Sequence, residues 1–301
     1  MVAKNSQTEF DYIKQMKSKK IPLSIKVVRT YIKVLYKISK KRAAKLVTKL
    51  FLTPQRVTLR SDQLEYYDSG KQEFIQFLDK DVFVFTKGEG PRIMLAHGWG
   101  SNSYIFRYLI DQLAEAGYSV VAFDYPAHGQ SSGKQTTLVE TSELVKHLSE
   151  LYGPFNSIIA YSFGGPTSIR ALELGLKIKN LVLLSAPTNI NSIFNPFFDI
   201  LDINSVLQDL FIDELVLLSG IDRAKLSPIN MNFDKKIRTL IVHDKNDEVI
   251  PQLDAELIHK AMRNSKLIIT SNLGHRGVPR TESVIHEITN FISSSEIGIE
   301  I

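Results

Sequence analysis

The chain has 301 residues, of which 44% are hydrophobic and 23% charged, a balance typical of a soluble globular protein with a sizeable core. It has no cysteine, which excludes disulfides, thiolate metal sites, iron–sulfur clusters and a cysteine nucleophile. The net charge of +5 is uneven, because residues 1–50 hold 14 Lys and Arg against two acidic residues. Basic and aromatic residues are not interleaved as in nucleic-acid-reading proteins, so we expect no nucleic-acid partner.

The N-terminal residues 1–54 are expected to form a basic helical extension, with one amphipathic helix over about 22–53 that is stopped by Pro54. Its basic residues recur every three or four positions: Lys26, Arg29, Lys33, Lys37, Lys40, Lys41, Lys45 and Lys49. The lysines interrupt every apolar run, which argues against a secretory signal and a transmembrane span.

Two interpretations of this basic helix stay open. In the first, which we favour, the helix packs on its own domain and leaves a solvated lysine face. In the second, residues 22–53 lie on an anionic membrane surface and make the protein a peripheral membrane protein. With no signal sequence and no cysteine, we expect a cytoplasmic protein in either case.

From Val82 onward, short apolar runs alternate with amphipathic helical stretches, which predicts a parallel sheet covered by helices. The expected strands are 82–85, 93–96, 120–123, 158–161, 181–184, 240–242 and 267–269. The expected helices are 104–116, 138–151, 165–174, 253–262 and 283–292. Between about 188 and 233 the alternation stops, and large apolar residues such as Phe194, Phe198 and Phe211 accumulate.

Four segments with candidate chemistry each follow an expected strand. Ala96-His97-Gly98-Trp99-Gly100 follows the second strand, and the loop from Asp124 to Ser131 follows the third. Ala160-Tyr161-Ser162-Phe163-Gly164 follows the fourth and opens a helix, so Ser162 would stand on a sharp turn with its hydroxyl exposed. The last segment, from His243 to Pro251, contains Asp247, and Leu273-Gly274-His275 follows the next strand.

Together these segments resemble the α/β-hydrolase fold family, and within it the esterase- and lipase-like serine hydrolases. The small-x-Ser-x-Gly turn has Ala160 in the place of the first glycine, and the chain order Ser162, Asp247, His275 is the family's order of nucleophile, acid and base. The resemblance implies a mostly parallel central sheet flanked by helices, in a catalytic domain over 55–301 with a small helical cap at about 188–233.

The resemblance also implies a role for individual residues. Ser162 would be the nucleophile, His275 the base and Asp247 the acid, while the main-chain amides of Trp99 and Phe163 would form the oxyanion hole. Asp244 and Glu248 compete with Asp247 as the acid, and the register of the motif favours Asp247.

The remaining histidines are expected to have structural roles. His97 and His128 match structural positions of the family's motifs, and a hydrogen-bonded histidine is favoured over a base at His128. His147, His259 and His286 fall in helical patterns and are expected to be surface or packing residues.

These observations predict a serine hydrolase that cleaves carboxylic esters with an apolar acyl group through an acyl-enzyme, without cofactor or metal. A lipase, monoacylglycerol-type or thioester hydrolase at a membrane surface stays open, as do a C–C bond hydrolase and a peptidase, because one triad serves them all. A non-catalytic binding module on the same fold is the alternative from another class, and the oligomeric state is undetermined.

Overall fold

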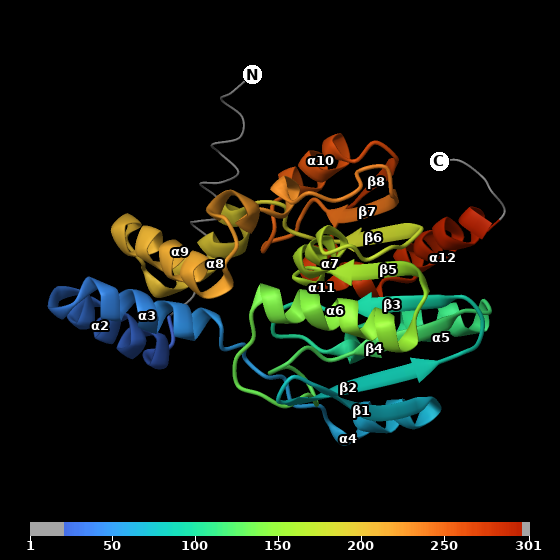
Figure 1. Ribbon diagram of the computed structural model, residues 1–301, viewed down its shortest axis with the longest axis horizontal. Helices are drawn as coiled ribbons and strands as arrows, with labels where there is room; N and C mark the ends of the chain where they lie inside the picture. The colour runs from blue at the N-terminus through green and yellow to red at the C-terminus, as the bar shows by residue number, and fades with distance from the viewer. Residues whose placement is uncertain (1–20, 297–301) are drawn as a thin grey trace.

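The computed structural model describes residues 21–296, and within them eight strands form one sheet (Figure 1). The strands lie in the order β1-β2-β4-β3-β5-β6-β7-β8, in which β2 runs antiparallel to both of its neighbours, β1 and β4, and the other neighbouring strands are parallel. Their bounds are β1 Lys71–Phe77, β2 Lys80–Lys87, β3 Arg92–Ala96, β4 Ser119–Phe123, β5 Phe155–Tyr161, β6 Asn180–Leu184, β7 Arg238–Asp244 and β8 Ser265–Thr270. The predicted α/β-hydrolase architecture is confirmed.

Helices cover both faces of this sheet because its central strands are buried on both sides. One face packs against α6 (Leu138–Tyr152), α7 (Gly164–Glu173) and α10 (Gln252–Ala261). The other face packs against α5 (Arg107–Glu115) and α12 (Glu282–Glu296). Alternate residues of one strand enter different cores: Met94 of β3 lies in the first core and Leu95 in the second.

Short helices fill the connections between these elements. They are α4 (Ser61–Glu65), η1 (Tyr66–Ser69), η2 (Ser103–Phe106), η3 (Arg223–Leu226), η4 (Pro228–Asn230), α11 (Gly274–Gly277) and η5 (Val278–Arg280). Of these, α11 matters most for the site, because it begins directly before His275 and follows β8.

A third apolar core lies beside the sheet and consists of helices alone. It joins α2 (Leu23–Ile38) and α3 (Lys40–Phe51) to α8 (Ile190–Leu201) and α9 (Ser205–Ser219), which follow β6 in the chain. Figure 1 shows these four helices grouped at one end of the molecule. The N-terminal helices α2 and α3 thus pack against α8 and α9 of the cap segment, although the two pairs of helices lie far apart in the sequence.

The N-terminal segment differs from the single helix that was predicted over 22–53. Ser39 adopts an extended conformation (φ −157°, ψ 108°) and separates α2 from α3. Its hydroxyl accepts a hydrogen bond from the N–H of Arg42 at 3.3 Å, so it caps α3. The break allows both helices to pack on the cap. No helix within residues 21–296 is both long and apolar enough to span a membrane.

Candidate active site

Ser162 lies on the sharp turn between β5 and α7, as its sequence context predicts. Its backbone has a φ of +50°, a strained value for a residue with a side chain, and its N–H donates to the carbonyl of Leu184 at 2.9 Å. Only glycine fits two positions later, because a Cβ on Gly164 would lie 2.1 Å from the carbonyl oxygen of Ala96. The turn therefore fixes the Ser162 hydroxyl at the carboxyl end of the sheet.

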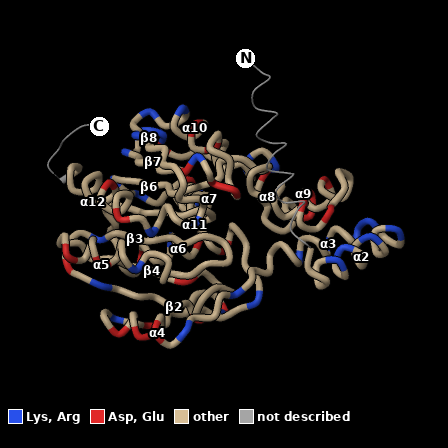
Figure 2. The backbone as a smooth tube through the Cα atoms, turned by 180° about the vertical axis from the view of Figure 1, so that it is seen from behind, with Lys and Arg blue, Asp and Glu red and all other residues tan. Residues whose placement is uncertain are grey.

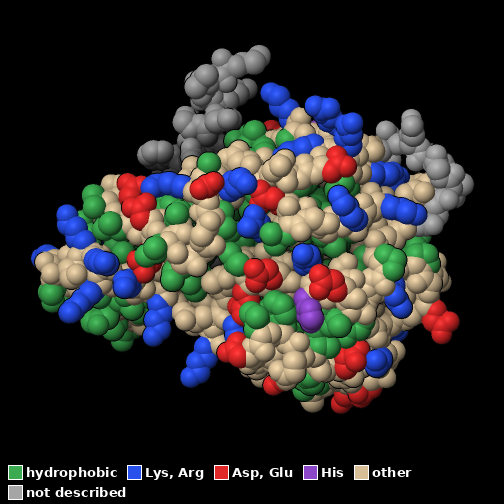
Figure 3. Space-filling view, viewed as in Figure 1, with side chains coloured by type: hydrophobic (Ala, Val, Ile, Leu, Met, Phe, Trp, Pro, Cys, Tyr) green, Lys and Arg blue, Asp and Glu red, His purple; other side chains and the backbone are tan. Residues whose placement is uncertain are grey.

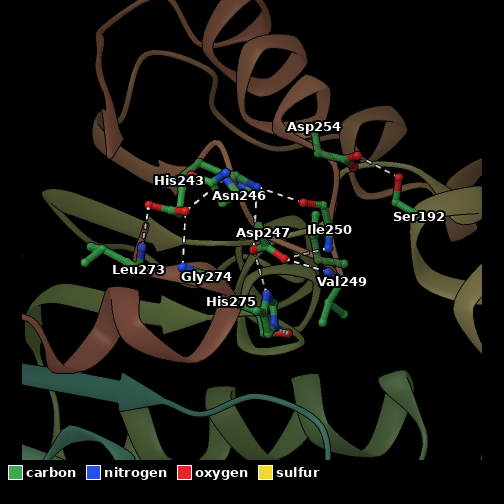
Figure 4. A network of polar contacts seen from close by, with 12 residues as sticks. Ser192, His243, Asn246, Asp247, Val249, Ile250, Asp254, Leu273, Gly274 and His275 are labelled. Atoms are coloured by element: carbon green, nitrogen blue, oxygen red, sulfur yellow. Dashed lines mark hydrogen bonds and ion pairs between the residues drawn. The ribbon is translucent and has the colours of Figure 1, made fainter. Parts of the chain in front are cut away.

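Three of the predicted residues form one hydrogen-bonded chain. His275 Nε2 lies 3.0 Å from Ser162 Oγ, and His275 Nδ1 lies 2.7 Å from Asp247 Oδ2. Figure 4 shows His275 pointing toward Asp247, which lies on the loop after β7. Because the carboxylate only accepts, Nδ1 carries a proton, and Nε2 of the neutral ring can accept the proton of the hydroxyl.

The loop around Asp247 holds its carboxylate in place. Its Oδ1 accepts from the N–H groups of Val249 and Ile250 at 2.8 and 2.9 Å. Burial raises the pKa of Asp247, but the hydrogen bond to His275 and these two N–H groups outweigh burial, so its pKa lies below the ordinary value. The acid is therefore ionised at neutral pH and can stabilise a protonated His275.

Asp244 has a different role from Asp247. Its buried carboxylate accepts from the Thr270 hydroxyl at 2.8 Å and from the N–H groups of Leu273 and Gly274 at 3.2 and 3.1 Å. It thus ties the loop before His275 to the end of β7. Among the competing carboxylates, Asp247 is the one in hydrogen-bond contact with the imidazole.

The two predicted oxyanion residues lie side by side next to the turn. The ring of Trp99 packs edge-on against that of Phe163, with 5.0 Å between centroids. Within the described part of the chain, neither main-chain N–H donates to a backbone carbonyl. Phe163 also precedes the N-terminus of α7, where the helix dipole favours negative charge. Within residues 21–296 these N–H groups therefore have no backbone acceptor, which leaves them as candidates to bind a substrate oxygen.

Both motif histidines are buried and hydrogen-bonded to the backbone. His97 Nε2 accepts from the N–H of Tyr125 at 3.0 Å, and His128 Nδ1 donates to the carbonyl of Pro126 at 3.0 Å. Burial lowers the pKa of His97 to about 4 and that of His128 to about 3. They stay neutral at physiological pH and support the loops around Ser162.

We expect these two histidines to make folding sensitive to mild acid. The unfolded chain protonates both near pH 6.5, while the folded chain keeps them neutral. Their stabilising contribution is thus complete above pH 6.5 and is lost as the pH falls toward about 4, by on the order of 1.4 kcal/mol per pH unit for each. Urea unfolding of the wild type at several pH values in this window measures the slope.

A variant separates this effect from other titrating groups. His128→Gln should flatten the slope by about the share of one histidine. An identical pH dependence in the His128 variant and the wild type would contradict the assignment.

The sequence analysis assigned no role to two residues near the site. Asp254 of α10 is buried and accepts from the N–H and hydroxyl of Thr188 at 2.5 and 2.9 Å and from the Ser192 hydroxyl at 2.6 Å, which anchors the start of α8 (Figure 4). His243 Nε2 donates to the carbonyl of Ile250 at 2.9 Å and braces the Asp247 loop. The contacts of Asp254 join distant parts of the chain and have no local pattern in the sequence, whereas the contact of His243 lies within the segment that contains Asp247.

An aromatic cluster connects the cap to the site. The ring of Phe51, at the end of α3, stacks on Trp99 with 5.7 Å between centroids and an interplanar angle of 13°. Phe51 also packs edge-on against Phe194, Phe197 and Phe211 of the cap helices at 5.1 to 5.4 Å. The N-terminal helices thus supply part of the apolar wall beside the candidate oxyanion residues.

The sequence also matches known families over the part of the chain that carries this geometry. A family model described as alpha/beta hydrolase fold matches residues 91–211, which include Ser162, and one described as TAP-like protein matches residues 221–298, which include Asp247 and His275. The chain belongs to the α/β-hydrolase superfamily.

Relatives with described functions point to hydrolases of this superfamily. The AB hydrolase superfamily protein YisY of Bacillus subtilis is 23% identical over 266 residues, 71% of this chain and 96% of that protein. Pimeloyl-[acyl-carrier protein] methyl ester esterase of Shewanella oneidensis is 34% identical over 110 residues. That match covers 35% of this α/β-hydrolase and only 38% of the esterase.

Solved structures share the fold at low sequence identity. The esterase Pf2001 of Pyrococcus furiosus superposes with a TM-score of 0.59 at 21% identity, over 80% of this chain and 98% of that chain. The meta-cleavage product hydrolase CumD of Pseudomonas fluorescens superposes with a TM-score of 0.55 at 17% identity, over 74% of this chain and 98% of that chain. One of these proteins is named an esterase and the other a meta-cleavage product hydrolase, so the fold leaves the reaction open.

Proposed function

We propose that this α/β-hydrolase is a serine hydrolase that cleaves carboxylic ester bonds. The observation that carries the proposal is the hydrogen-bonded chain from Asp247 through His275 to Ser162. Beside it lie the main-chain N–H groups of Trp99 and Phe163, which have no backbone acceptor in the described part of the chain. This arrangement provides a nucleophile, a base with a fixed tautomer and donors for a developing oxyanion. A non-catalytic binding module would not need these groups at hydrogen-bond distance from one another.

The reaction follows from the positions of these groups. Ser162 Oγ passes its proton to His275 Nε2 and bonds to the carbonyl carbon, while the N–H groups of Trp99 and Phe163 hold the resulting oxyanion. Asp247 stabilises the imidazolium. The bond from carbon to the alcohol oxygen then breaks, and His275 returns the proton to the alcohol, which leaves. Water activated by His275 attacks the acyl-enzyme and releases the acid and free Ser162.

The surroundings of the site favour an apolar acyl group. The aromatic cluster of Phe51, Phe194, Phe197 and Phe211 borders Trp99 and offers apolar surface directly beside the proposed oxyanion hole. The esterase relatives support the ester class of substrate, since their names specify a methyl ester esterase. A thioester hydrolase uses the same steps with a thiol as the leaving group.

A series of p-nitrophenyl esters with acyl chains from acetyl to lauroyl tests this function. We expect turnover by the purified full chain, with kcat/KM rising with acyl length until the aromatic wall limits it. Acyl-coenzyme A substrates run in parallel report thioester cleavage. If no ester is hydrolysed but free coenzyme A is released from the acyl-coenzyme A substrates, the protein is a thioesterase and the ester proposal is wrong. Inactivity on both classes of substrate would contradict the proposed hydrolase function.

Removing the Phe51 ring is expected to change the chain-length preference. Phe51→Ala opens space beside Trp99, so the ratio of kcat/KM for long over short esters should rise about tenfold. Phe51→Leu retains more packing and should give a smaller shift. Phe74→Ala serves as a control, because Phe74 lies on β1 away from the cap and is exposed. An unchanged preference in both Phe51 variants would place the acyl group elsewhere.

A further inference from the structure

The outermost helix, α2, is fastened to the cap by one of its faces. Ile32 is buried in the helical core, and the guanidinium of Arg29 donates to the carbonyls of Ile200 and Asp199 at 2.9 and 3.1 Å. Lys33 forms an ion pair of 2.5 Å with Asp202 at the end of α8. These contacts fix the rotation of α2 about its axis and so decide which side chains face outward.

A second face of α2 is apolar and exposed. Leu23, Val27, Tyr31, Val34 and Ile38 follow one another at steps of four, four, three and four residues, so they line one side of the helix. Their exposed fractions lie between 51% and 77%. We call these five residues the α2 stripe. Isolated exposed apolar residues are ordinary, but a continuous row along a helix marks a surface that binds something.

Basic residues accompany the α2 stripe. Residues 21–50 hold nine Lys and Arg and no acidic residue. Figure 2 shows α2 and α3 marked by basic positions only, and Figure 3 shows hydrophobic and basic side chains together at this end of the molecule. Lys26 and Lys37 are exposed and have no acidic partner within the described chain. The surface is thus both apolar and positively charged.

We propose that α2 binds the surface of an anionic phospholipid bilayer. The α2 stripe enters the boundary between headgroups and acyl chains, and Lys26 and Lys37 contact lipid phosphates. The charge decides between this partner and a second copy of the chain. Two copies paired through α2 would bring Lys26 and Lys37 of both copies together, and α2 itself holds no acidic residue to compensate these charges.

This surface is connected to the candidate active site through the chain itself. After the turn at Ser39, α3 leads from the end of α2 to Phe51, which stacks on Trp99. A bilayer bound at α2 would therefore lie at the same end of the molecule as the cap. The binding proposal goes beyond the proposed hydrolysis and does not depend on it, since vesicle binding and ester turnover are measured separately.

Sedimentation of the full chain with vesicles tests the proposal. The vesicles contain phosphatidylcholine alone or phosphatidylcholine mixed with phosphatidylglycerol. We expect binding to the anionic vesicles that weakens as salt rises, and little binding to the neutral ones. Val27→Gln with Val34→Gln should reduce the partition coefficient about tenfold, and Lys26→Glu with Lys37→Glu by at least as much. Glutamine is a good helix former, so α2 should persist.

The matched control replaces two exposed leucines elsewhere, Leu78 and Leu151, by glutamine. They are 70% and 54% exposed, comparable to Val27 and Val34, so the control removes similar apolar surface. It should bind anionic vesicles like the wild type. The proposal is overturned if the wild type ignores anionic vesicles, if the α2 variants bind as the control does, or if they instead convert a dimer into a monomer in light scattering. In each case the rate on a soluble ester reports the catalytic proposal independently.

Discussion

Ser162→Ala is expected to lower kcat for p-nitrophenyl ester hydrolysis by roughly 10⁵-fold or more, with little change in fold. Alanine removes the only atom that bonds to the acyl group, while His275 and Asp247 keep their mutual hydrogen bond at 2.7 Å. Because no acyl-enzyme can form, the residual rate reflects transition-state stabilisation without a nucleophile. Initial rates at saturating ester, beside a circular dichroism spectrum of the variant, give the measurement.

Ser168→Ala provides the matched control for this prediction. Ser168 lies on the same helix, α7, and its buried hydroxyl has no hydrogen-bond partner in the described chain, so its removal should leave kcat within about twofold. Retention of most of the activity by Ser162→Ala would show that another group attacks the ester, and the proposed mechanism would then be wrong.

Asp247→Asn is expected to lower kcat by about 10³- to 10⁴-fold. The asparagine carbonyl can still accept from the N–H groups of Val249 and Ile250, so the loop keeps its shape. Its amide then faces His275 Nδ1 as a donor, which favours the wrong tautomer of the ring. The neutral side chain also no longer stabilises the imidazolium. Pre-steady-state measurement of p-nitrophenolate release isolates the acylation step that depends on this pair.

The neighbouring Glu248 tests the choice of acid. Glu248→Gln removes one carboxylate from the same loop and should change kcat only a few-fold, because the carboxylate bonded to His275 is that of Asp247. A large loss in the Glu248 variant together with near-normal activity of Asp247→Asn would assign the acid to Glu248.

The sequence predicts the positions of the candidate site residues well for a physical reason. In a parallel sheet the carboxyl ends of neighbouring strands meet at one edge, so segments that follow β3, β5, β7 and β8 converge there. Trp99, Ser162, Asp247 and His275 each stand in such a segment. Local patterns suffice because each of these strands contains a short apolar run, at residues 93–96, 158–160, 240–242 and 267–269.

Features that depend on contacts between distant parts of the chain could not be predicted in this way. The edge strand β1 has an apolar residue only at scattered positions, since much of it is exposed, and it was not recognised. The interruption at Ser39 was also missed, although the capping of α3 by the Ser39 hydroxyl is a local contact. The sequence also does not show which apolar residues of α2 are buried, because the contacts of Arg29 and Lys33 with the end of α8 set the orientation of the helix.

Covalent labelling of the wild type with a fluorophosphonate, followed by peptide mass spectrometry, tests the central claim most directly. The reagent phosphonylates a serine that a neighbouring base activates, so it reports the nucleophile without assuming a substrate. We predict a single adduct on Ser162, absent in Ser162→Ala and formed far more slowly in His275→Ala. Equal labelling of Ser162→Ala, or an adduct on another residue in the wild type, would contradict the account.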